Sequence, residues 1–110
     1  MAFTFNRPSK YRAVPTVLDG IRFASKKEAG RYAELLILKK ARKIRNLVLQ
    51  PRFKLEVGGV LICTYVADFS YEEGPGRVRK IEDVKGVRTP VYKIKKKLMQ
   101  AIHGIEITEV

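Results

Sequence analysis

The stretch that decides the fold is residues 65–85, YVADFSYEEGPGRVRKIEDVK. In residues 65–71, aromatic and β-branched side chains alternate with others, and residues 77–85 have the same character, so both segments are predicted to be strands. Residues 72–76 between them contain the glycines and the proline that are typical of a turn. An antiparallel hairpin is therefore predicted.

The register of this hairpin brings three charged residues together. A hairpin tip between Pro75 and Gly76 places Asp68 directly opposite Asp83, with Cβ atoms roughly 5 Å apart on one face. Lys85 lies two residues after Asp83 on the same strand, so it shares that face. Two carboxylates and an ammonium group are thus predicted to converge on a small patch of sheet.

Such a patch is unfavourable unless something compensates it. Facing carboxylates repel, and each raises the pKa of the other unless a cation lies between them. Mg²⁺ prefers one or two carboxylates together with water and phosphate oxygens, so the pattern is compatible with a magnesium site, with Mn²⁺ as a second option. The alternative is an ordinary solvated hairpin on which Lys85 pairs with the acids, and charge alone does not separate the two.

Composition narrows the class of protein. The chain has 110 residues, a length typical of one domain. Its 23 Lys and Arg against 11 Asp and Glu give a net charge of +12, which points to a polyanionic partner, most commonly nucleic acid. Anionic lipid is the weaker alternative, because no apolar stretch approaches the length of a membrane span. No membrane association is expected.

Cys63 is the single cysteine of the sequence, which argues against a disulfide framework and against a cysteine-based zinc site. The first twelve residues lack the apolar core of a signal peptide. A cytoplasmic location is therefore expected.

Residues 1–15 are expected to form a basic arm ahead of a single domain of residues 16–110. Lys10 and Arg12 in the arm are candidate contacts to a phosphate backbone, although a charged terminal arm is often merely solvated. Residues 16–23 are predicted to form a short hairpin around Asp19 and Gly20, a strong two-residue turn signal.

A helix is predicted over residues 25–42, with Ser25 as its N-cap. Glu28, three residues later, completes a capping-box pattern. Glu28 also borders the apolar stripe of the helix, so it is alternatively a third carboxylate delivered to the sheet; spacing alone favours the cap. The predicted buried face comprises Ala29, Tyr32, Ala33, Leu35, Leu36 and Ile37.

The next predicted strands cover residues 44–57 and 60–71, joined by a turn at Gly58 and Gly59. Pro51 interrupts the first of them and suggests an edge or a bulge. A strict two-residue turn places Leu49 opposite Asp68 and turns Gln50 to the other face, whereas a bulge at Pro51 reverses this. Gln50 is therefore either a strand-end polar residue or a site residue.

A second helix is predicted from Thr89 and Pro90, as N-cap and first helical residue, to a C-cap at His103 and Gly104. Its predicted buried stripe comprises Val91, Ile94, Leu98, Ala101 and Ile102. Lys93, Lys96 and Lys97 project elsewhere, and with Arg88 in the preceding loop they are either a solvated face or contacts to DNA phosphates. Residues 104–110 read as a closing strand. The expected fold is an α/β or α+β domain with a mixed sheet and flanking helices.

These motifs resemble a known nuclease superfamily. Glu28 on the first helix, Asp68 on a central strand and Asp83-Val84-Lys85 on the next strand resemble the PD-(D/E)xK pattern, with Ala67 standing where the motif has proline. A wider set of motifs is similar to a phage and prophage family catalogued as a domain of unknown function and related to Holliday-junction resolvases and transposon-end endonucleases. That set is Lys10-Tyr11, Asp19-Gly20-Ile21-Arg22-Phe23, Ser25-Lys26-Lys27-Glu28, Gln50-Pro51, Ala67-Asp68-Phe69 and Glu82-Asp83-Val84-Lys85-Gly86.

The resemblance implies a restriction-endonuclease-like sheet with flanking helices and a role for each motif residue. Asp68 and Asp83 would hold Mg²⁺, with the Val84 carbonyl as a further ligand. Glu28 would complete the metal shell, support it through water, or hold a second ion. Lys85 would orient or help deprotonate the attacking water and support developing negative charge.

The implied activity is metal-dependent cleavage of DNA by a homodimer, with branched or recombination DNA as the expected substrate and Gln50 as a contact to substrate or water. The alternative from another class is a non-catalytic basic protein that binds nucleic acid.

Overall fold

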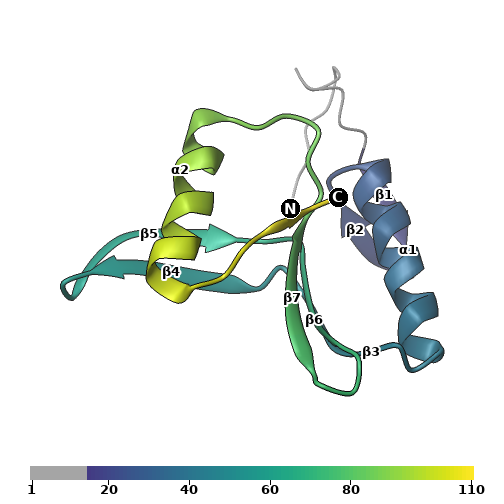
Figure 1. The fold of residues 1–110 in the computed structure, drawn as a ribbon. Helices are drawn as coiled ribbons and strands as arrows, with labels where there is room; N and C mark the ends of the chain where they lie inside the picture. The colour runs from purple at the N-terminus through teal and green to yellow at the C-terminus, as the bar shows by residue number, and fades with distance from the viewer. Residues whose placement is uncertain (1–14) are drawn as a thin grey trace.

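A computed structural model describes residues 15–110 (Figure 1). The predicted arm residues Lys10 and Arg12 lie outside this range. In chain order the described elements are β1 (Thr16–Leu18), β2 (Ile21–Phe23), α1 (Lys26–Lys40), β3 (Ile44–Leu49), β4 (Arg52–Val57), β5 (Val60–Val66), β6 (Phe69–Glu73), β7 (Val78–Asp83), α2 (Pro90–Leu98), the π-helical turn η1 (Met99–His103) and β8 (Thr108–Glu109).

The central element is a mixed sheet of order β3-β6-β7-β8, in which β7 and β8 are parallel and the other neighbours antiparallel. β1–β2 and β4–β5 form separate two-stranded sheets. In Figure 1, α1 and α2 lie on opposite sides of the β6–β7 hairpin. The predicted α+β class, with a mixed sheet and flanking helices, is confirmed.

The hairpin that decides the fold has the predicted register. Phe69 pairs with Glu82 and Tyr71 with Lys80, and the Asp68 N–H donates to the Glu82 carbonyl at 3.1 Å. This register continues to place Asp68 opposite Asp83. The first hairpin is also as predicted, since Asp19 and Gly20 both have positive φ (56° and 74°), as a type I′ turn requires.

The two long strands predicted over residues 44–57 and 60–71 are wrong, because each breaks into two. The breaks fall at the same level, at Gln50 and Pro51 on one strand and at Ala67 and Asp68 on the other. Backbone pairing nevertheless continues across the break, since the Gln50 N–H donates to the Asp68 carbonyl (2.9 Å) and the Ala67 N–H to the Pro51 carbonyl (3.1 Å). Pro51 has no N–H for a ladder and Gln50 is left-handed (φ 51°). The ribbon therefore creases here and passes from the β4–β5 sheet into the central sheet.

The register of the ribbon changes at Ile62. Glu56 pairs with Leu61 but Leu55 pairs with Cys63, so Ile62 is an extra residue on β5. Leu49 consequently pairs with Phe69 and not with Asp68. The register reversal considered for a bulge at Pro51 does occur, but its origin is a bulge nearer the hairpin tip.

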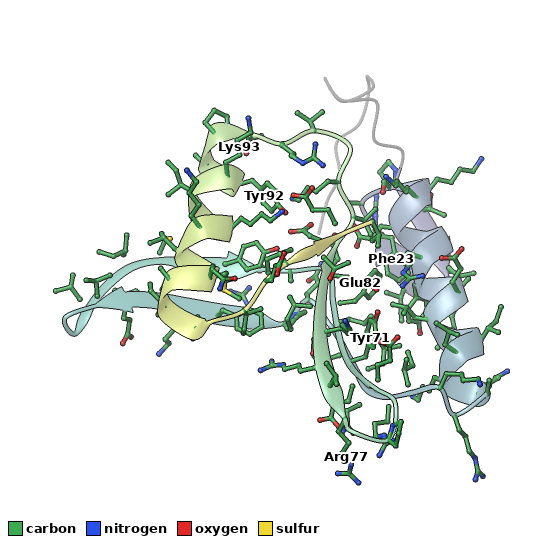
Figure 2. All side chains as sticks on the ribbon, viewed as in Figure 1. Phe23, Tyr71, Arg77, Glu82, Tyr92 and Lys93 are labelled. Carbon is green, nitrogen blue, oxygen red and sulfur yellow. The ribbon has the colours of Figure 1, made fainter. Side chains whose placement is uncertain are left out.

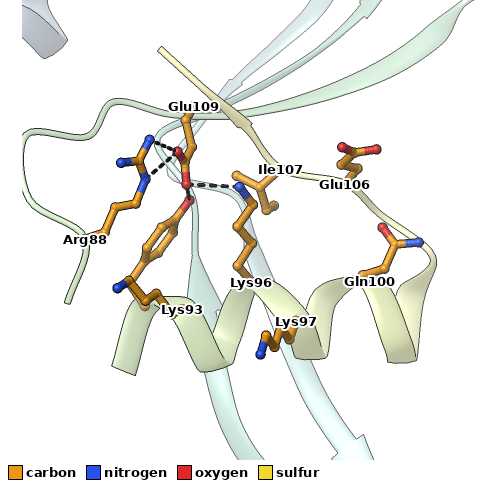
Figure 3. Close-up of a pocket in the computed structure, with 9 residues that line it drawn as sticks. Arg88, Lys93, Lys96, Lys97, Gln100, Glu106, Ile107 and Glu109 are labelled. Atoms are coloured by element: carbon orange, nitrogen blue, oxygen red, sulfur yellow. Dashed lines mark hydrogen bonds and ion pairs between the residues drawn. The ribbon is translucent and has the colours of Figure 1, made fainter. Parts of the chain in front are cut away.

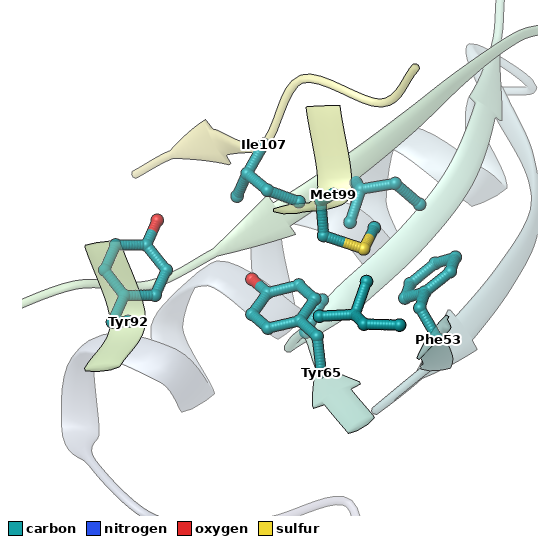
Figure 4. Close-up of a cluster of buried hydrophobic side chains, with 8 residues drawn as sticks. Phe53, Tyr65, Tyr92, Met99 and Ile107 are labelled. Atoms are coloured by element: carbon teal, nitrogen blue, oxygen red, sulfur yellow. The ribbon is translucent and has the colours of Figure 1, made fainter. Parts of the chain in front are cut away.

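Two hydrophobic clusters hold the elements in place. One lies between α1 and the central sheet, and Figure 2 shows Phe23 and Tyr71 on this side. The other joins the β4–β5 hairpin to α2, η1 and β7, and in Figure 4 it contains Tyr65, Tyr92 and Met99. The site described below lies where these two clusters adjoin.

The buried face predicted for the second helix is right only in part, since Leu98 and Ile102 pack against the core cluster but the other three residues do not. Val91 and Ile94 are 60% and 59% exposed and Ala101 is also exposed, whereas Tyr92 and Met99 are buried. Tyr92 and Met99 place a ring and a long thioether in the core, and the Tyr92 hydroxyl has a partner there. On α1 the predicted face is largely right, but Ile37 is 66% exposed.

The predicted helix ends are confirmed. Ser25 and Thr89 cap α1 and α2 by accepting from the N–H groups of Glu28 and Tyr92. Gly104 ends η1 in the left-handed conformation (φ 66°), as a C-cap glycine does. Across residues 15–110, none of the helices combines the length and the apolar character that a membrane span requires.

Candidate functional site

Asp68 and Asp83 form the centre of the candidate site. Asp83 is the last residue of β7 and is 4% exposed, while Asp68 lies at the crease just before β6. The Val84 N–H donates to Asp68 Oδ2 at 2.7 Å, so the Asp68 carboxyl group is bonded to the backbone directly after Asp83, and burial together with the neighbouring Asp83 raises the pKa of Asp68. The predicted convergence of the two acids is therefore present.

Both carboxylate oxygens of Asp83 have a partner. Lys85 Nζ lies 3.1 Å from Oδ1, and the Tyr65 hydroxyl donates to Oδ2. Burial, followed by the hydrogen bond to Asp83, raises the pKa of Tyr65 above its usual value, so the phenol keeps the proton it donates. Lys85 thus lies on the same patch as the two acids, as predicted.

Glu28 approaches this patch from α1. The Ser25 hydroxyl accepts from the Glu28 N–H at 3.1 Å, so the main chain of Glu28 takes part in the helix cap. Its carboxyl group is 9% exposed and interacts electrostatically with Asp83 and Lys85. The side chain therefore borders the acids while the backbone is capped, so the two roles do not compete.

The site has an excess of buried negative charge. Burial raises the pKa of Asp68 to about 7, and the neighbouring Asp83 and Glu28 act in the same direction against the Val84 N–H. Burial and Asp83 also raise the pKa of Glu28, while Lys85 lowers it. At neutral pH this arrangement binds a proton or another cation more readily than isolated carboxyl groups do.

The residues present suit a hard divalent cation. Within residues 15–110 no three His, Cys, Asp or Glu side chains converge as a metal-binding group. Mg²⁺ does not need such a cage, since it commonly binds through one or two carboxylates and otherwise to water and phosphate. Asp68 and Asp83 supply two carboxylates and Glu28 borders them. Burial, and to a smaller extent the neighbouring acids, raise the pKa of Asp68, and a bound cation would favour its charged form.

A basic cavity of about 610 Å³ adjoins the site along α2 (Figure 3). Glu109 on β8 is its organising residue. Its Oε1 accepts from Arg88 Nε at 2.7 Å, and its Oε2 accepts from Lys96 Nζ at 3.0 Å and from the Tyr92 hydroxyl at 2.7 Å. These hydrogen bonds, led by the one from Arg88, lower the pKa of Glu109 to about 2. Lys93 and Lys97 line the same cavity.

The structure brings the remaining predicted residues together only in part. Arg88, Lys93, Lys96 and Lys97 share the basic cavity. The Gln50 backbone bonds to Asp68, but its side chain is exposed. Val84 contributes its N–H to Asp68, and its carbonyl as a metal ligand stays a prediction. Lys10 and Arg12 lie outside the described residues.

Sequence reasoning missed Tyr65, Tyr92 and Glu109. The signal for Tyr92 was present, because Tyr92, Lys95, Met99 and Ile102 follow helical spacing as regularly as the stripe that was chosen. Glu109 is brought beside Asp83 by the parallel pairing of β8 with β7. No local pattern indicates that pairing.

Glu82 precedes Asp83 on β7, and its carboxylate is bound by residues other than those of the candidate site. Its carboxylate is 1% exposed and takes a bidentate contact from Arg31 on α1, with Nε 2.8 Å from Oε1 and Nη2 2.6 Å from Oε2. The Tyr71 hydroxyl donates to Oε2 as well. Glu82 thus ties α1 to β7, and Figure 2 shows it near Tyr71. Because successive side chains of a strand alternate, Asp83 points to the opposite face.

Comparison with known proteins identifies a family for this chain. No curated protein and no solved structure matches it. The family model described as "Protein of unknown function (DUF1064)" matches residues 8–107, nearly the whole chain and all of the candidate site except Glu109. The chain therefore belongs to the DUF1064 family.

Proposed function

We propose that this protein is a divalent-metal-dependent DNA endonuclease that hydrolyses phosphodiester bonds, acting on branched or recombination DNA in the manner of Holliday-junction resolvases. The observation that carries the proposal is the convergence of Asp68, Asp83 and Lys85 on one buried patch, with the Glu28 carboxyl group beside it. A purely structural patch would not require two adjacent acids of which one, Asp68, has a pKa raised by burial and by its neighbour.

Each residue has a distinct task in this proposal. Asp68 and Asp83 would hold Mg²⁺ or Mn²⁺, with Glu28 supporting the shell. The bound ion supplies a hydroxide at neutral pH and Lewis-acid stabilisation of the developing charge. The Lys85 ammonium, anchored 3.1 Å from Asp83, would orient the attacking water and hydrogen-bond the negatively charged phosphate oxygens as the bond to the leaving group breaks.

The surroundings of the site support DNA as the substrate. The net charge of +12 attracts a polyanion, and the cavity beside the acids carries Arg88, Lys93, Lys96 and Lys97. These cations would contact phosphates flanking the cleaved bond, which positions DNA without reading its sequence. We place the enzyme in the cytoplasm and propose that it acts as a homodimer, which suits paired incisions.

The alternative function is non-catalytic binding of nucleic acid. It is favoured by the basic cavity together with the fact that, within residues 15–110, three metal-ligating side chains do not converge. In that case the acids only hold Lys85 in place and stabilise the backbone at the crease of the ribbon. Binding then needs no metal.

The test is cleavage of a labelled four-way junction and a linear duplex in Mg²⁺, Mn²⁺ or EDTA. We expect metal-dependent cutting by the wild type and a loss of at least about a hundredfold in Asp83→Ala and Lys85→Ala. Glu56→Gln and Lys54→Ala remove an exposed acid and an exposed lysine from β4 and should cut normally. If wild type cuts nothing with any metal while all variants bind DNA equally, the endonuclease is wrong and the binding protein is right.

A further inference from the structure

Tyr92 has two contacts that lead to different parts of the site. It lies in the first turn of α2 and is 6% exposed. The face of its ring lies under Lys85, with Nζ 3.9 Å from the ring centroid. Its hydroxyl donates to Glu109 Oε2 at 2.7 Å. The ring therefore contacts the candidate catalytic lysine while the hydroxyl contacts the residue that organises the basic cavity.

The Lys85 ammonium is held between an acid and an aromatic face. Asp83 Oδ1 lies 3.1 Å from Nζ on one side, and the electron-rich face of Tyr92 lies on another. A lysine side chain has many rotamers, and a single surface ion pair rarely fixes it. With both contacts the ammonium group is restricted to the space beside Asp83.

Glu109 helps to fix the ring through its hydrogen bond to the Tyr92 hydroxyl. β8 pairs in parallel with β7 and places Glu109 opposite Asp83. The Lys85 N–H donates to the Val110 carbonyl at 3.2 Å and the Val110 N–H to the Asp83 carbonyl at 3.0 Å. The strand that carries Glu109 is thus bonded to the segment that carries Asp83 and Lys85, so ring and ammonium share one rigid frame.

We propose that Tyr92 is the positioning residue for Lys85: its ring, packed in the hydrophobic core and bonded at the hydroxyl to Glu109, keeps the ammonium group beside Asp83. This proposal rests on the proposed nuclease function, in which Lys85 acts on the water and phosphate. Without this role, Tyr92 would be interpreted only as a core residue that packs against Tyr65, whose ring centroid is 6.5 Å away.

The first readout is independent of activity. In the metal-free protein, ring current from Tyr92 should move the Lys85 side-chain ¹H signals upfield, and these signals are assigned by their loss in Lys85→Arg. The upfield shift should persist in Tyr92→Phe, which keeps the ring, and disappear in Tyr92→Leu. Phe53→Leu removes a ring from the same hydrophobic cluster and should leave the Lys85 signals in place.

The second readout is cleavage, compared among variants that circular dichroism shows to be folded. Tyr92→Phe should retain most of the wild-type kcat, while Tyr92→Leu should lose roughly tenfold in kcat with little change in KM, because misplacing a catalytic group slows chemistry without weakening DNA binding. A role in packing alone predicts that Phe53→Leu and Tyr92→Leu lose activity alike.

The outcomes separate this proposal from the function it rests on. A folded Tyr92→Leu protein with unchanged Lys85 signals overturns the positioning role, whatever the wild type cleaves. If the upfield shift is lost in Tyr92→Leu but the wild type cuts no DNA, the placement of Lys85 by Tyr92 is confirmed and the nuclease function is excluded. Loss of the shift together with unchanged kcat shows that the contact exists and does not position a catalytic group, which also overturns the proposal.

Discussion

At the scale of single residues, the protonation of Asp68 links the site to stability. Burial raises its pKa from 3.8 to about 7, with Asp83 and Glu28 acting in the same direction. The folded state therefore retains a proton that the unfolded chain releases. This contribution to stability is complete below pH 3.8 and is lost as the pH rises through about 7.

The corresponding prediction concerns Asp68→Asn in EDTA. The amide oxygen can still accept from the Val84 N–H, while the charge that repels Asp83 at high pH is gone. We expect the free energy of unfolding of the variant to exceed that of the wild type by about 1–2 kcal/mol at pH 8, a value discounted for the partial exposure of Asp68. The difference should be smaller at pH 5. Urea unfolding at both pH values measures it.

Glu56→Gln is the matched control, since it makes the same chemical change on an exposed carboxyl group of β4. Its stability should follow that of the wild type across the pH range. Parallel pH profiles for wild type and Asp68→Asn would show that the Asp68 carboxyl group is not held protonated by the fold.

At the scale of elements, the contact between α1 and β7 determines where Glu28 lies. Glu82 and Arg31 form a bidentate pair that is almost closed to solvent on the Glu82 side. Arg31 is one helical turn after Glu28 on the same helix. The pair therefore fixes α1 against the strand that ends in Asp83.

Removing one partner of the Arg31–Glu82 pair should lower the free energy of unfolding far more than removing both. Arg31→Met leaves the Glu82 carboxylate buried without its cation and should destabilise the protein by about 3–5 kcal/mol. The double variant Arg31→Met with Glu82→Leu removes the buried charge and should recover much of that loss. Chemical denaturation of the single and double variants measures the difference.

Glu34→Gln provides the control for this cycle. Glu34 is the exposed partner of the same guanidinium, 3.0 Å from Arg31 Nη1, and its loss should cost less than about 1 kcal/mol. If Glu34→Gln destabilises as much as Arg31→Met, the importance of the buried pair is refuted.

The same scale shows what the sequence could and could not predict. Local chemistry determined the caps at Ser25 and Thr89, the Asp19-Gly20 turn and the register that opposes Asp68 to Asp83, because each depends on neighbouring residues. The crease at Pro51 was signalled by a proline, but its counterpart on the partner strand was not, since nothing in residues 60–71 breaks the strand pattern.

The rest of the candidate site depends on distant contacts. The orientation of α2 about its axis follows from the packing of Tyr92 and from its hydrogen bond to Glu109. Glu109 reaches this position only because β8 pairs in parallel with β7. Because Val91 and Ile94 are also apolar, periodicity offered two stripes and gave no ground for choosing between them.

At the scale of the whole molecule, the exposed apolar residues of α2 bear on whether the protein forms a dimer. Val91 and Ile94 on α2 are exposed, as are Leu61 and Ile62 on β5. Lys95 Nζ bonds to the Thr64 carbonyl at 3.1 Å, so the helix and this strand adjoin. A second copy of the chain would cover this apolar surface, which supports the proposed homodimer.

The prediction is that Ile94→Glu disrupts the dimer and leaves the fold intact. Sedimentation equilibrium should give a dimer for the wild type and a monomer for this variant, because the new carboxylates lose hydration at the interface. Val78→Glu adds the same charge at an exposed valine on β7 and should remain dimeric. A wild type that is monomeric at all concentrations would exclude the homodimer.

The bonding of Val110 to both Asp83 and Lys85 has a consequence for biosynthesis. The carboxylate patch draws on Glu28 early in the chain, on the creased ribbon in the middle, and on β8 with the adjoining Val110. While the ribosome is still adding residues short of that point, β7 lacks its parallel neighbour and Tyr92 lacks Glu109. The nascent chain thus carries the acids before it has the frame that orients them, and a complete site arises only once synthesis has passed residue 110.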